Sequence, residues 1–346
     1  MRDRPSVYEV ARHAGVSTAT VSRVLAGHER VLPVTRDKVL NAVTELGYVP
    51  SGAARDLAAR RTGVLGLCFP DLDQDEGEDD AAYWYDEVIR GMERAARRSG
   101  YAVLIAASHH RDDSGLVLSI AGRCDGLVVL ARTASQAMID HVATRIPVVL
   151  LATEEGGGRP DRAIDHLVVA NETGAYQVTA HLADGHGYTS ICFIAGPPDS
   201  PDSARRLDGF RRATAGLPET PVYHGDFTTA GGRRVAERII AAGRVPHALV
   251  CANDQTAIGV MAALQQAGLS VPGDVAVTGF DGITLGRHLH PSLTTVVQPM
   301  AALGDTAVAM LTDRLGGPAR PRLTLPRRTV ELPVRLELRG SCGCAQ

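Results

Sequence analysis

The sequence is poor in aromatic residues, which make up 4% of its 346 residues and include one tryptophan. It has a single lysine, Lys38, whose neighbours fit neither a phosphate-binding P-loop nor a Schiff-base or kinase lysine. The G-x-G-x-x-G, G-x-S-x-G and H-E-x-x-H motifs are also missing. These absences argue against the common nucleotide-dependent and hydrolytic enzymes.

No stretch approaches the ~18 consecutive apolar residues of a membrane span, and the first residues do not resemble an export signal. Only six cysteines occur, several of them inside apolar runs, which is typical of reduced thiols in a cytosolic protein. We therefore expect a cytoplasmic protein with no membrane partner.

Cys342 and Cys344 form a C-x-C pair near the C-terminus, with no second cysteine pair or histidine cluster beside them in the sequence. Structural metal sites usually combine two such groups. We therefore expect no metal and no cofactor, and we interpret 341–346 as a mobile tail. A metal site is the less favoured alternative.

Hydrophobic residues at 45% and charged residues at 22% are ordinary values for a folded protein, whose length favours two or three globular units. The net charge of −3 is unevenly distributed. Residues 1–62 carry ten Lys or Arg against six Asp or Glu, a charge of +4, which leaves −7 on residues 63–346. This asymmetry indicates that only the N-terminal segment contacts a polyanion.

Apolar residues of the N-terminal segment recur at helical spacing and predict helices over 7–14, 18–26 and 35–46. Ser17 is suited to cap the second helix, and glycines follow the first and third. Two helices joined by a short glycine turn are typical of a DNA-binding helix-turn-helix. The outward short polar residues and Arg23 of the second helix favour this interpretation over an ordinary three-helix bundle.

From residue 63 onward, apolar runs alternate with helical segments, which predicts parallel sheets covered by helices. The expected strands are 64–69, 102–106, 126–130, 147–151, 191–195, 248–252 and 275–280, and the expected helices are 87–98, 171–184, 203–214, 231–242 and 255–267. Ligands of such sheets bind beyond the carboxyl ends of the strands. The loops in which we expect a ligand begin at residues 70, 132, 152, 196, 253 and 281.

Residues 71–80 include seven acidic residues, too charged a composition to pack in a core. The segment lacks the Gly and Glu spacing of an EF-hand calcium loop. We interpret it as a solvated loop, with cation binding as the alternative.

Several longer motifs follow one another along the chain. They are VYEVARHAGVSTATVSRVL at 7–25, TRDKV at 35–39, LGYVP at 46–50, NETGAYQVTAHLAD at 171–184, RLDGF at 206–210, GDFT at 225–228, ANDQTAIG at 252–259, VTGFD at 277–281 and LTTVVQP at 293–299. By these motifs, which extend over nearly the whole chain, the sequence resembles the LacI/GalR family of bacterial transcription regulators.

The resemblance implies an N-terminal all-α helix-turn-helix headpiece with a hinge helix, followed by an α/β periplasmic-binding-protein-like domain of two Rossmann-like subdomains. It implies a headpiece over 1–50, a hinge helix and linker over 51–62, and an effector-binding and dimerisation domain over 63–340. The latter divides into an N-subdomain of about 63–167 plus 299–326 and a C-subdomain of about 168–298 plus 327–340.

The resemblance also implies which residues contact DNA. Arg23 matches a recognition-helix residue and is suited to bond guanine O6 and N7. Leu57 matches the hinge leucine that wedges into the minor groove, and its alternative role is packing between subunits. The full expected set is Ser6, Tyr8, Ser17, Thr18, Ala19, Thr20, Ser22, Arg23, Tyr48, Ala54 and Leu57.

A second set of matched positions implies the effector site. It comprises Trp84, Tyr85, Arg206, Phe227, Asn253, Asp281 and Gln298. Aromatic faces combined with Asp, Asn, Gln and Arg suit a sugar or a related metabolite, although Trp84 could alternatively pack in the core. The family pattern is broken at Ala26, Leu32, Ala152, Ala170 and Gly282, so the ligand of a particular family member does not carry over.

The sequence therefore predicts a sequence-specific transcriptional regulator, expected to be a repressor, whose affinity for double-stranded operator DNA changes when a small-molecule effector binds. No leucine heptads follow Gly340, so we expect a homodimer on a pseudo-palindrome rather than a tetramer. The alternative is a cytoplasmic solute-binding protein or an enzyme on a Rossmann-like fold.

Overall fold

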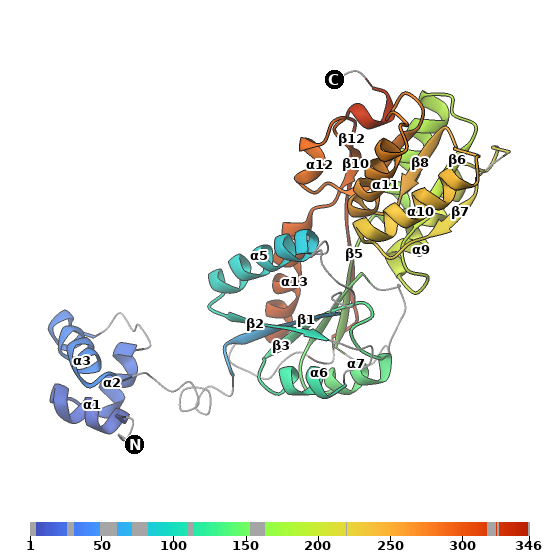
Figure 1. Ribbon diagram of the computed structural model, residues 1–346. Coiled ribbons are helices and arrows are strands. Elements are labelled where there is room, and N and C mark those ends of the chain that lie inside the picture. The colour runs from blue at the N-terminus through green and yellow to red at the C-terminus, as the bar shows by residue number, and fades with distance from the viewer. Residues whose placement is uncertain are drawn as a thin grey trace. The chain divides into compact units, whose positions relative to one another are not determined.

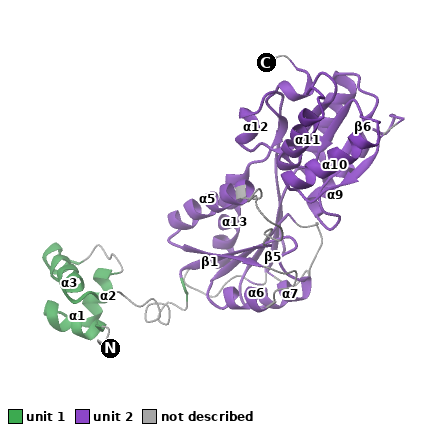
Figure 2. Cartoon of the chain, viewed as in Figure 1, with its two compact units in different colours: residues 1–62 green, residues 63–346 purple. Residues whose placement is uncertain are grey.

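The structure, a computed structural model, describes residues 5–25, 31–48, 61–70, 82–108, 114–152, 163–218, 220–316, 323 and 325–344. The chain forms two compact units, Met1–Thr62 and Gly63–Gln346 (Figure 2). The predicted DNA contacts Ala54 and Leu57 and the acidic segment 71–80 lie outside the described residues.

Helices α1 (Val7–Ala14), α2 (Thr18–Leu25) and α3 (Pro33–Leu46) form the described part of the first unit (Figure 1). Gly15 and Gly47 end α1 and α3 with φ of 67° and 60°, a left-handed conformation that glycine adopts without steric cost. The predicted glycine turn of the helix-turn-helix is thereby confirmed.

A small apolar core holds the three helices of the first unit together. Val10, Val21 and Val39, one from each helix, are fully buried in it. Helix α3 begins two residues earlier than predicted, because Pro33 is well suited to the first turn of a helix.

The second unit contains two six-stranded sheets. The first has the order β11-β5-β4-β3-β1-β2, with all neighbours parallel. Its strands are β1 (Val64–Pro70), β2 (Ala102–Ser108), β3 (Gly126–Leu130), β4 (Val148–Leu151), β5 (Ile164–Val169) and β11 (Thr329–Leu332). One face packs against α5 (Ala82–Arg98) and α13 (Met300–Leu315), and the other against α6 (Ser114–Ala121) and α7 (Gln136–Val142) (Figure 1). We call this sheet and its helices the first subdomain.

The second subdomain has the strand order β12-β10-β9-β8-β6-β7, parallel except for the antiparallel pair of β12 and β10. Its strands are β6 (Ile191–Ala195), β7 (Val222–His224), β8 (Ala248–Cys251), β9 (Ala276–Asp281), β10 (Thr294–Val297) and β12 (Arg335–Glu337). Its helices are α8 (Asn171–Ala180) with the π turn η1 (His181–Gly185), α9 (Pro201–Ala213), α10 (Thr229–Ala241), α11 (Asp254–Gln266), the short α12 (Leu285–His288) and the 3-10 turn η2 (Gly340–Cys342).

Successive side chains of a strand point to opposite faces of the sheet, so alternate residues pack against different helices. In β6, Cys192 and Ile194 pack with α10 and α11, whereas Ile191, Phe193 and Ala195 pack with α8 and α9. Both faces are therefore buried, as the continuous apolar runs of the sequence predict.

The chain passes between the two sheets three times, after β5, β10 and β11. The last crossing corrects the predicted boundary at residue 327, which assigned 327–340 to the C-subdomain. Strand β11 instead pairs in parallel with β5, so that residues up to Leu332 belong to the first subdomain.

Periodicity did not reveal five of the strands, β5, β7, β10, β11 and β12. In β5, Asp165 and His166 interrupt the apolar run, yet both side chains are fully buried. Arg314 of α13 donates to Asp165 at 2.7 Å, and Arg328 donates to the same carboxylate at 2.8 Å.

No helix among the described residues is long and apolar enough to cross a membrane.

The interpretation of 341–346 as a mobile tail is wrong for its described part, 341–344. The Ser341 hydroxyl donates to the carbonyl of Val277 at 2.6 Å and accepts from the backbone of Thr294 at 2.8 Å. Cys342 is fully buried in the core of the second subdomain. The end of the chain is held because its polar groups complete the hydrogen bonding of β9 and β10.

We expect Asp165→Ala to lower the free energy of unfolding by ~3–5 kcal/mol, because it leaves the fully buried guanidinium of Arg314 without its counter-charge. The matched control is Asp313→Ala, which removes the other, more exposed carboxylate bound to Arg328 and should change the free energy by less than ~1 kcal/mol. Urea denaturation followed by circular dichroism measures both.

The difference in unfolding free energy between wild type and Asp165→Ala is expected to depend on pH. Burial alone would raise the pKa of Asp165, but hydrogen bonds from Arg314 and Arg328 hold it below its ordinary value. Its stabilising contribution is therefore present above the unfolded-state pKa of about 3.9 and is lost as the pH falls below it. The difference between wild type and Asp165→Ala should narrow at acid pH, and equal losses from the two variants at neutral pH would contradict the assignment.

Candidate functional site

Helix α2 presents one apolar and one polar face. Val21 and Val24 are buried against the other two helices, while Ala19, Ser22 and Arg23 are exposed. The predicted base-contacting side chains Ala19 and Arg23 are thus accessible on the face opposite to the core.

Ser17 and Thr20, two of the expected DNA contacts, are bonded to each other at the start of α2. The Ser17 hydroxyl accepts from the backbone of Thr20 at 3.2 Å and lies 2.9 Å from its hydroxyl, which confirms Ser17 as the cap of α2. Thr18 is half-buried. These bonds fix the N-terminal turn of α2, where backbone N–H groups favour phosphate.

The remaining described headpiece residues differ in exposure. The Tyr8 side chain is 74% exposed, whereas Tyr48 packs partly against the headpiece core. Ser6 caps α1 in a reciprocal arrangement with Glu9, since the Ser6 backbone donates to the Glu9 carboxylate at 2.7 Å. The Ser6 side chain is therefore occupied in holding α1.

All seven residues predicted for the effector site line one pocket of the second unit. The other lining residues, which sequence reasoning did not assign, are Pro70, Leu130, Ala131, Arg132, Ala152, Ser200, Asp202, Asp226, Thr228 and Gln255. The lining comes from both subdomains and lies at the carboxyl ends of their strands, where the predicted loops begin.

Arg206, from α9, is the buried cation of the pocket, with 3% of its surface exposed. Its Nε donates to Asn171 at 2.8 Å and its Nη1 to the carbonyl of Ala252 at 2.6 Å. Its charge lies 3.5 Å from Asp281 and 3.8 Å from Asp202. Two carboxylates and two neutral acceptors therefore compensate one buried guanidinium.

The acids around Arg206 are raised in pKa by burial. Burial raises the pKa of Asp281, and the Arg206 charge and a hydrogen bond from Gln298 oppose this rise. Burial also raises the pKa of Asp202, against the influence of Arg206 and Asn171. The pocket thus offers a partly compensated set of hydrogen-bond acceptors around a single cation.

Asp254, which sequence reasoning did not single out, fixes the loop that carries Asp281. Its carboxylate accepts from the backbones of Gly282 and Ile283, both at 2.8 Å, and from the Thr295 hydroxyl at 2.6 Å. Burial and the nearby Asp281 raise its pKa. Its position directly after Asn253 in the 252–259 motif was the available signal.

Asn253 and Phe227 form another corner of the pocket. The Asn253 Oδ1 caps α11 by accepting from Thr256 at 3.1 Å, and its Nδ2 donates to the carbonyl of Phe227 at 2.8 Å. Phe227 has a left-handed φ of 74°, and its ring lies directly over Gly196. A Cβ at Gly196 would be 2.2 Å from the ring, so only glycine leaves room for this aromatic wall.

The opposite wall comes from α5. Tyr85 stacks on Phe69 of β1 with ring centroids 4.7 Å apart, and Trp84 meets Tyr85 edge-on at 5.4 Å. Trp84 lines the pocket and also packs partly against the core of the first subdomain. The two roles considered for Trp84 are therefore compatible.

An ion pair connects the subdomains beside the pocket. Arg132, after β3, donates from Nε to Asp199, after β6, at 2.9 Å. Arg132 has a left-handed φ of 73°.

Possible metal ligands gather elsewhere among the described residues, at His181, His186, Cys342 and Cys344, none of which lines the pocket.

A helix-turn-helix unit with an exposed second helix, in one chain with two parallel-sheet subdomains that share a pocket of aromatic and charged side chains, defines the class of ligand-binding transcription regulators. Residues 6–51 match the model of bacterial regulatory proteins of the lacI family, and residues 179–342 match a periplasmic binding protein-like domain.

Comparisons with individual proteins and solved structures give the same result. The chain is 32% identical to catabolite control protein A of Priestia megaterium, over 97% of this chain and 98% of the relative. The lac repressor dimer bound to operator and the anti-inducer ONPF has a TM-score of 0.81 at 26% identity, covering 98% and 99% of the two chains. The CelR–cellobiose complex has a TM-score of 0.71 at 28% identity, covering 98% and 100%. The chain belongs to the LacI family of bacterial transcription regulators.

We expect Gly196→Ala to lower the free energy of unfolding by ~1–3 kcal/mol, because its Cβ would displace the Phe227 ring. Gly225→Ala is the matched control, since a Cβ there would be no closer than 3.4 Å to any neighbour, a backbone carbonyl. Thermal denaturation of the two variants tests this. A Gly196→Ala protein as stable as the Gly225→Ala protein would contradict the placement of Phe227.

Proposed function

We propose that this chain is a homodimeric transcriptional repressor whose operator affinity is set by a neutral, sugar-like metabolite bound between its two subdomains. The observation that carries the proposal is the convergence of side chains from both sheets on one pocket around the buried Arg206. A ligand that contacts both subdomains binds one of their relative arrangements more tightly than others, and this difference is the source of allosteric coupling.

The lining favours a neutral polyhydroxylated ligand over an anion. The carboxylates of Asp202 and Asp281 lie beside the single charge of Arg206, the third lining carboxylate, of Asp226, is paired with Arg234, and the second lining cation, Arg132, is paired with Asp199. A phosphorylated ligand would therefore meet net negative charge. Aromatic walls from both subdomains suit the apolar faces of a sugar ring, while the carboxylates accept from its hydroxyls. The solved CelR complex contains cellobiose, which supports this ligand class.

The headpiece side of the proposal is binding to operator DNA through α2. Arg23, Thr18 and Ala19 would contact base edges, and the capped N-terminus of α2 would lie near phosphate. The lac repressor dimer in complex with operator supports a dimer on a pseudo-palindrome.

We further propose that the pocket binds rather than converts its ligand and that the protein works in the cytoplasm, where its DNA is.

The direct test is a binding titration with DNA that contains a family-type palindrome, at several salt concentrations and with a panel of neutral sugars and their phosphates. We expect affinity to fall steeply with salt, because several phosphates are contacted, and to change with one neutral sugar. Thermal shift identifies that sugar, since a ligand of the native state raises its Tm. Salt-insensitive binding would overturn the DNA assignment, and a response only to phosphorylated sugars would overturn the ligand class.

We expect Arg23→Ala to reduce discrimination between operator and mutated operator by ~1–3 kcal/mol per half-site, because the guanine contact is lost. Arg12→Ala removes an exposed charge from α1 instead and should weaken binding to all sequences about equally. Competition binding on the two DNAs measures the ratio. Unaltered discrimination in Arg23→Ala would refute its role.

We expect Asp281→Asn to weaken effector binding about 10- to 100-fold, since a hydrogen bond to a charged group contributes ~1.5–3 kcal/mol. Asparagine has the shape of aspartate, so the substitution adds no steric demand at this position, where φ is 124°. Operator affinity without effector should be unchanged. Asp208→Asn, an exposed change on the same helix as Arg206, is the control, and calorimetric titration with the identified sugar is the measurement. Wild-type affinity in Asp281→Asn would count against the pocket.

A further inference from the structure

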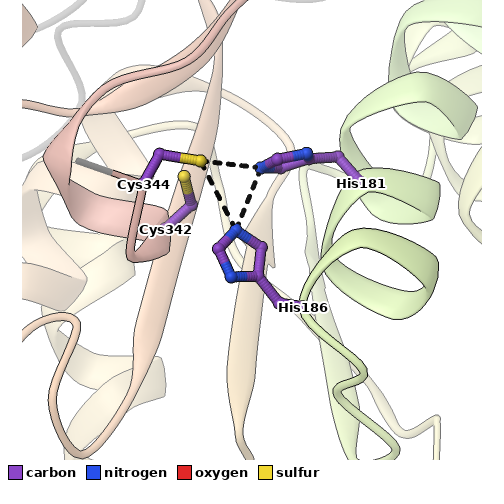
Figure 3. Close-up of side chains that lie close together, drawn as sticks. All are labelled: His181, His186, Cys342 and Cys344. Atoms are coloured by element: carbon purple, nitrogen blue, oxygen red, sulfur yellow. Dashed lines mark hydrogen bonds between the residues drawn. The ribbon is translucent and has the colours of Figure 1, made fainter. Parts of the chain in front are cut away.

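Four side chains that ligate metals meet in the second subdomain, away from the pocket lining. They are His181 and His186 at the end of α8 and Cys342 and Cys344 at the end of the chain (Figure 3). Their four ligand atoms all lie within 4.8 Å of one another. Figure 3 shows both imidazoles directed toward the Cys344 sulfur, with the Cys342 sulfur beside it.

Two special backbone turns create this meeting. The π turn η1 spans His181–Gly185, and because its hydrogen bonds run from residue i to i+5, it carries His186 back beside His181. Such π turns are rare and are often found at functional sites. At the other segment, Gly343 adopts a φ of 98°, which turns the chain so that Cys344 returns beside Cys342.

Three of the four ligand atoms lie at distances close to those of a tetrahedral zinc site, whereas the Cys342 Sγ is the more distant one, within 4.8 Å of the others. The His181 and His186 Nε2 atoms are 3.1 Å apart, and the Cys344 Sγ is 3.4 Å and 3.5 Å from them. With Zn–N of about 2.05 Å and Zn–S of about 2.3 Å, a tetrahedron requires roughly 3.3 Å between two nitrogens and roughly 3.6 Å between nitrogen and sulfur. An ion would be seated by movements of a few tenths of an ångström in these three side chains and by a closer approach of the Cys342 sulfur of about 1 Å.

The surroundings resemble those of ligands held in place. Cys342 is fully buried, and the Thr294 hydroxyl lies 3.1 Å from its sulfur, where it can stabilise a thiolate. The His186 ring is stacked on Tyr188, with centroids 5.4 Å apart.

We propose that His181, His186, Cys342 and Cys344 form a Cys2His2 structural zinc site that fastens the C-terminal segment to the end of α8. Two thiolates and two imidazoles are the ligand set that zinc prefers, and all four positions are filled by protein, as in a structural rather than a catalytic site. On binding, the two thiols lose their protons to solvent and each imidazole provides the Nε2 lone pair.

The site is separate from the ligand pocket. Asn171, which binds Arg206, begins α8, and the zinc ligands lie at the other end of this ten-residue helix, about 15 Å away. Zinc would join two segments more than 150 positions apart in the sequence, and cross-links that close long loops gain the most by restricting the unfolded chain. We therefore expect zinc to affect stability and to leave sugar and operator binding intact.

The experiment uses the full chain purified with a thiol reductant, loaded with zinc sulfate and passed over a desalting column in metal-free buffer. We expect about one zinc per chain in the wild type, and at least a tenfold lower content in Cys344→Ser and His186→Gln. Both residues are only half-buried, so the variants should fold, which circular dichroism checks. The controls Cys124→Ala and His224→Gln, which remove a thiol and an imidazole elsewhere, should retain zinc.

Cobalt(II) provides a second measurement, because a tetrahedral cobalt–thiolate centre has intense visible absorption that a surface-bound ion lacks. This absorption should appear in the wild type and controls and disappear in both ligand variants. Chelation by EDTA should lower the Tm of the wild type and leave that of Cys344→Ser unchanged. Zinc content in the wild type no higher than in the ligand variants, or equal cobalt spectra in all of them, would overturn the proposal.

Discussion

The ligand-binding part of this protein depends on compensation of one buried charge, the guanidinium of Arg206. Arg206 cannot lose its charge, and an uncompensated charge in the interior costs several kcal/mol. Its partners therefore have to come from different elements: Asn171 from the start of α8, Ala252 after β8, Asp281 from β9 and Asp202 from its own helix. Its guanidinium also lies 3.9 Å from the centre of the Phe280 ring. A single cation thus fixes the ends of several elements at the carboxyl edge of the second sheet.

The same arrangement explains why the pocket can respond to a ligand. Asn253 and Asp254 form their hydrogen bonds within the protein and thereby keep the loops of the site in place. The remaining polar groups of the site face the cavity. The first subdomain contributes aromatic surface and Arg132, whose ion pair with Asp199 joins the two subdomains beside the pocket. A ligand in the pocket therefore acts on the boundary between the two subdomains, beside this ion pair.

Much of the architecture was accessible from the sequence because it depends on local spacing. The strands and helices predicted from periodicity appear with shifted ends, the largest shift being at α5, which begins five residues earlier than predicted. The hinge helix implied for 51–62 lies almost entirely outside the described residues. Strand β5 was missed because Asp165 and His166 break its apolar run, and only the position of Arg314 in α13 makes their burial favourable. The effector residues were found through motif resemblance. Arg132 was expected only as the start of a ligand loop, and Asp202 and Asp226 were not assigned, because short motifs do not reveal which side chains face one another.

The sequence by itself determined the helix-turn-helix, the alternating α/β organisation and the separation of a basic head from an acidic body, since helical periodicity, apolar runs and charge are properties of neighbouring residues. Only the tertiary structure decided which distant side chains meet. A C-x-C pair without partners in its own segment suggested a tail, but the π turn His181–Gly185 brings together the imidazoles of His181 and His186, 163 and 158 positions before Cys344. Such a meeting depends on how strands and helices pack, and no local pattern encodes that.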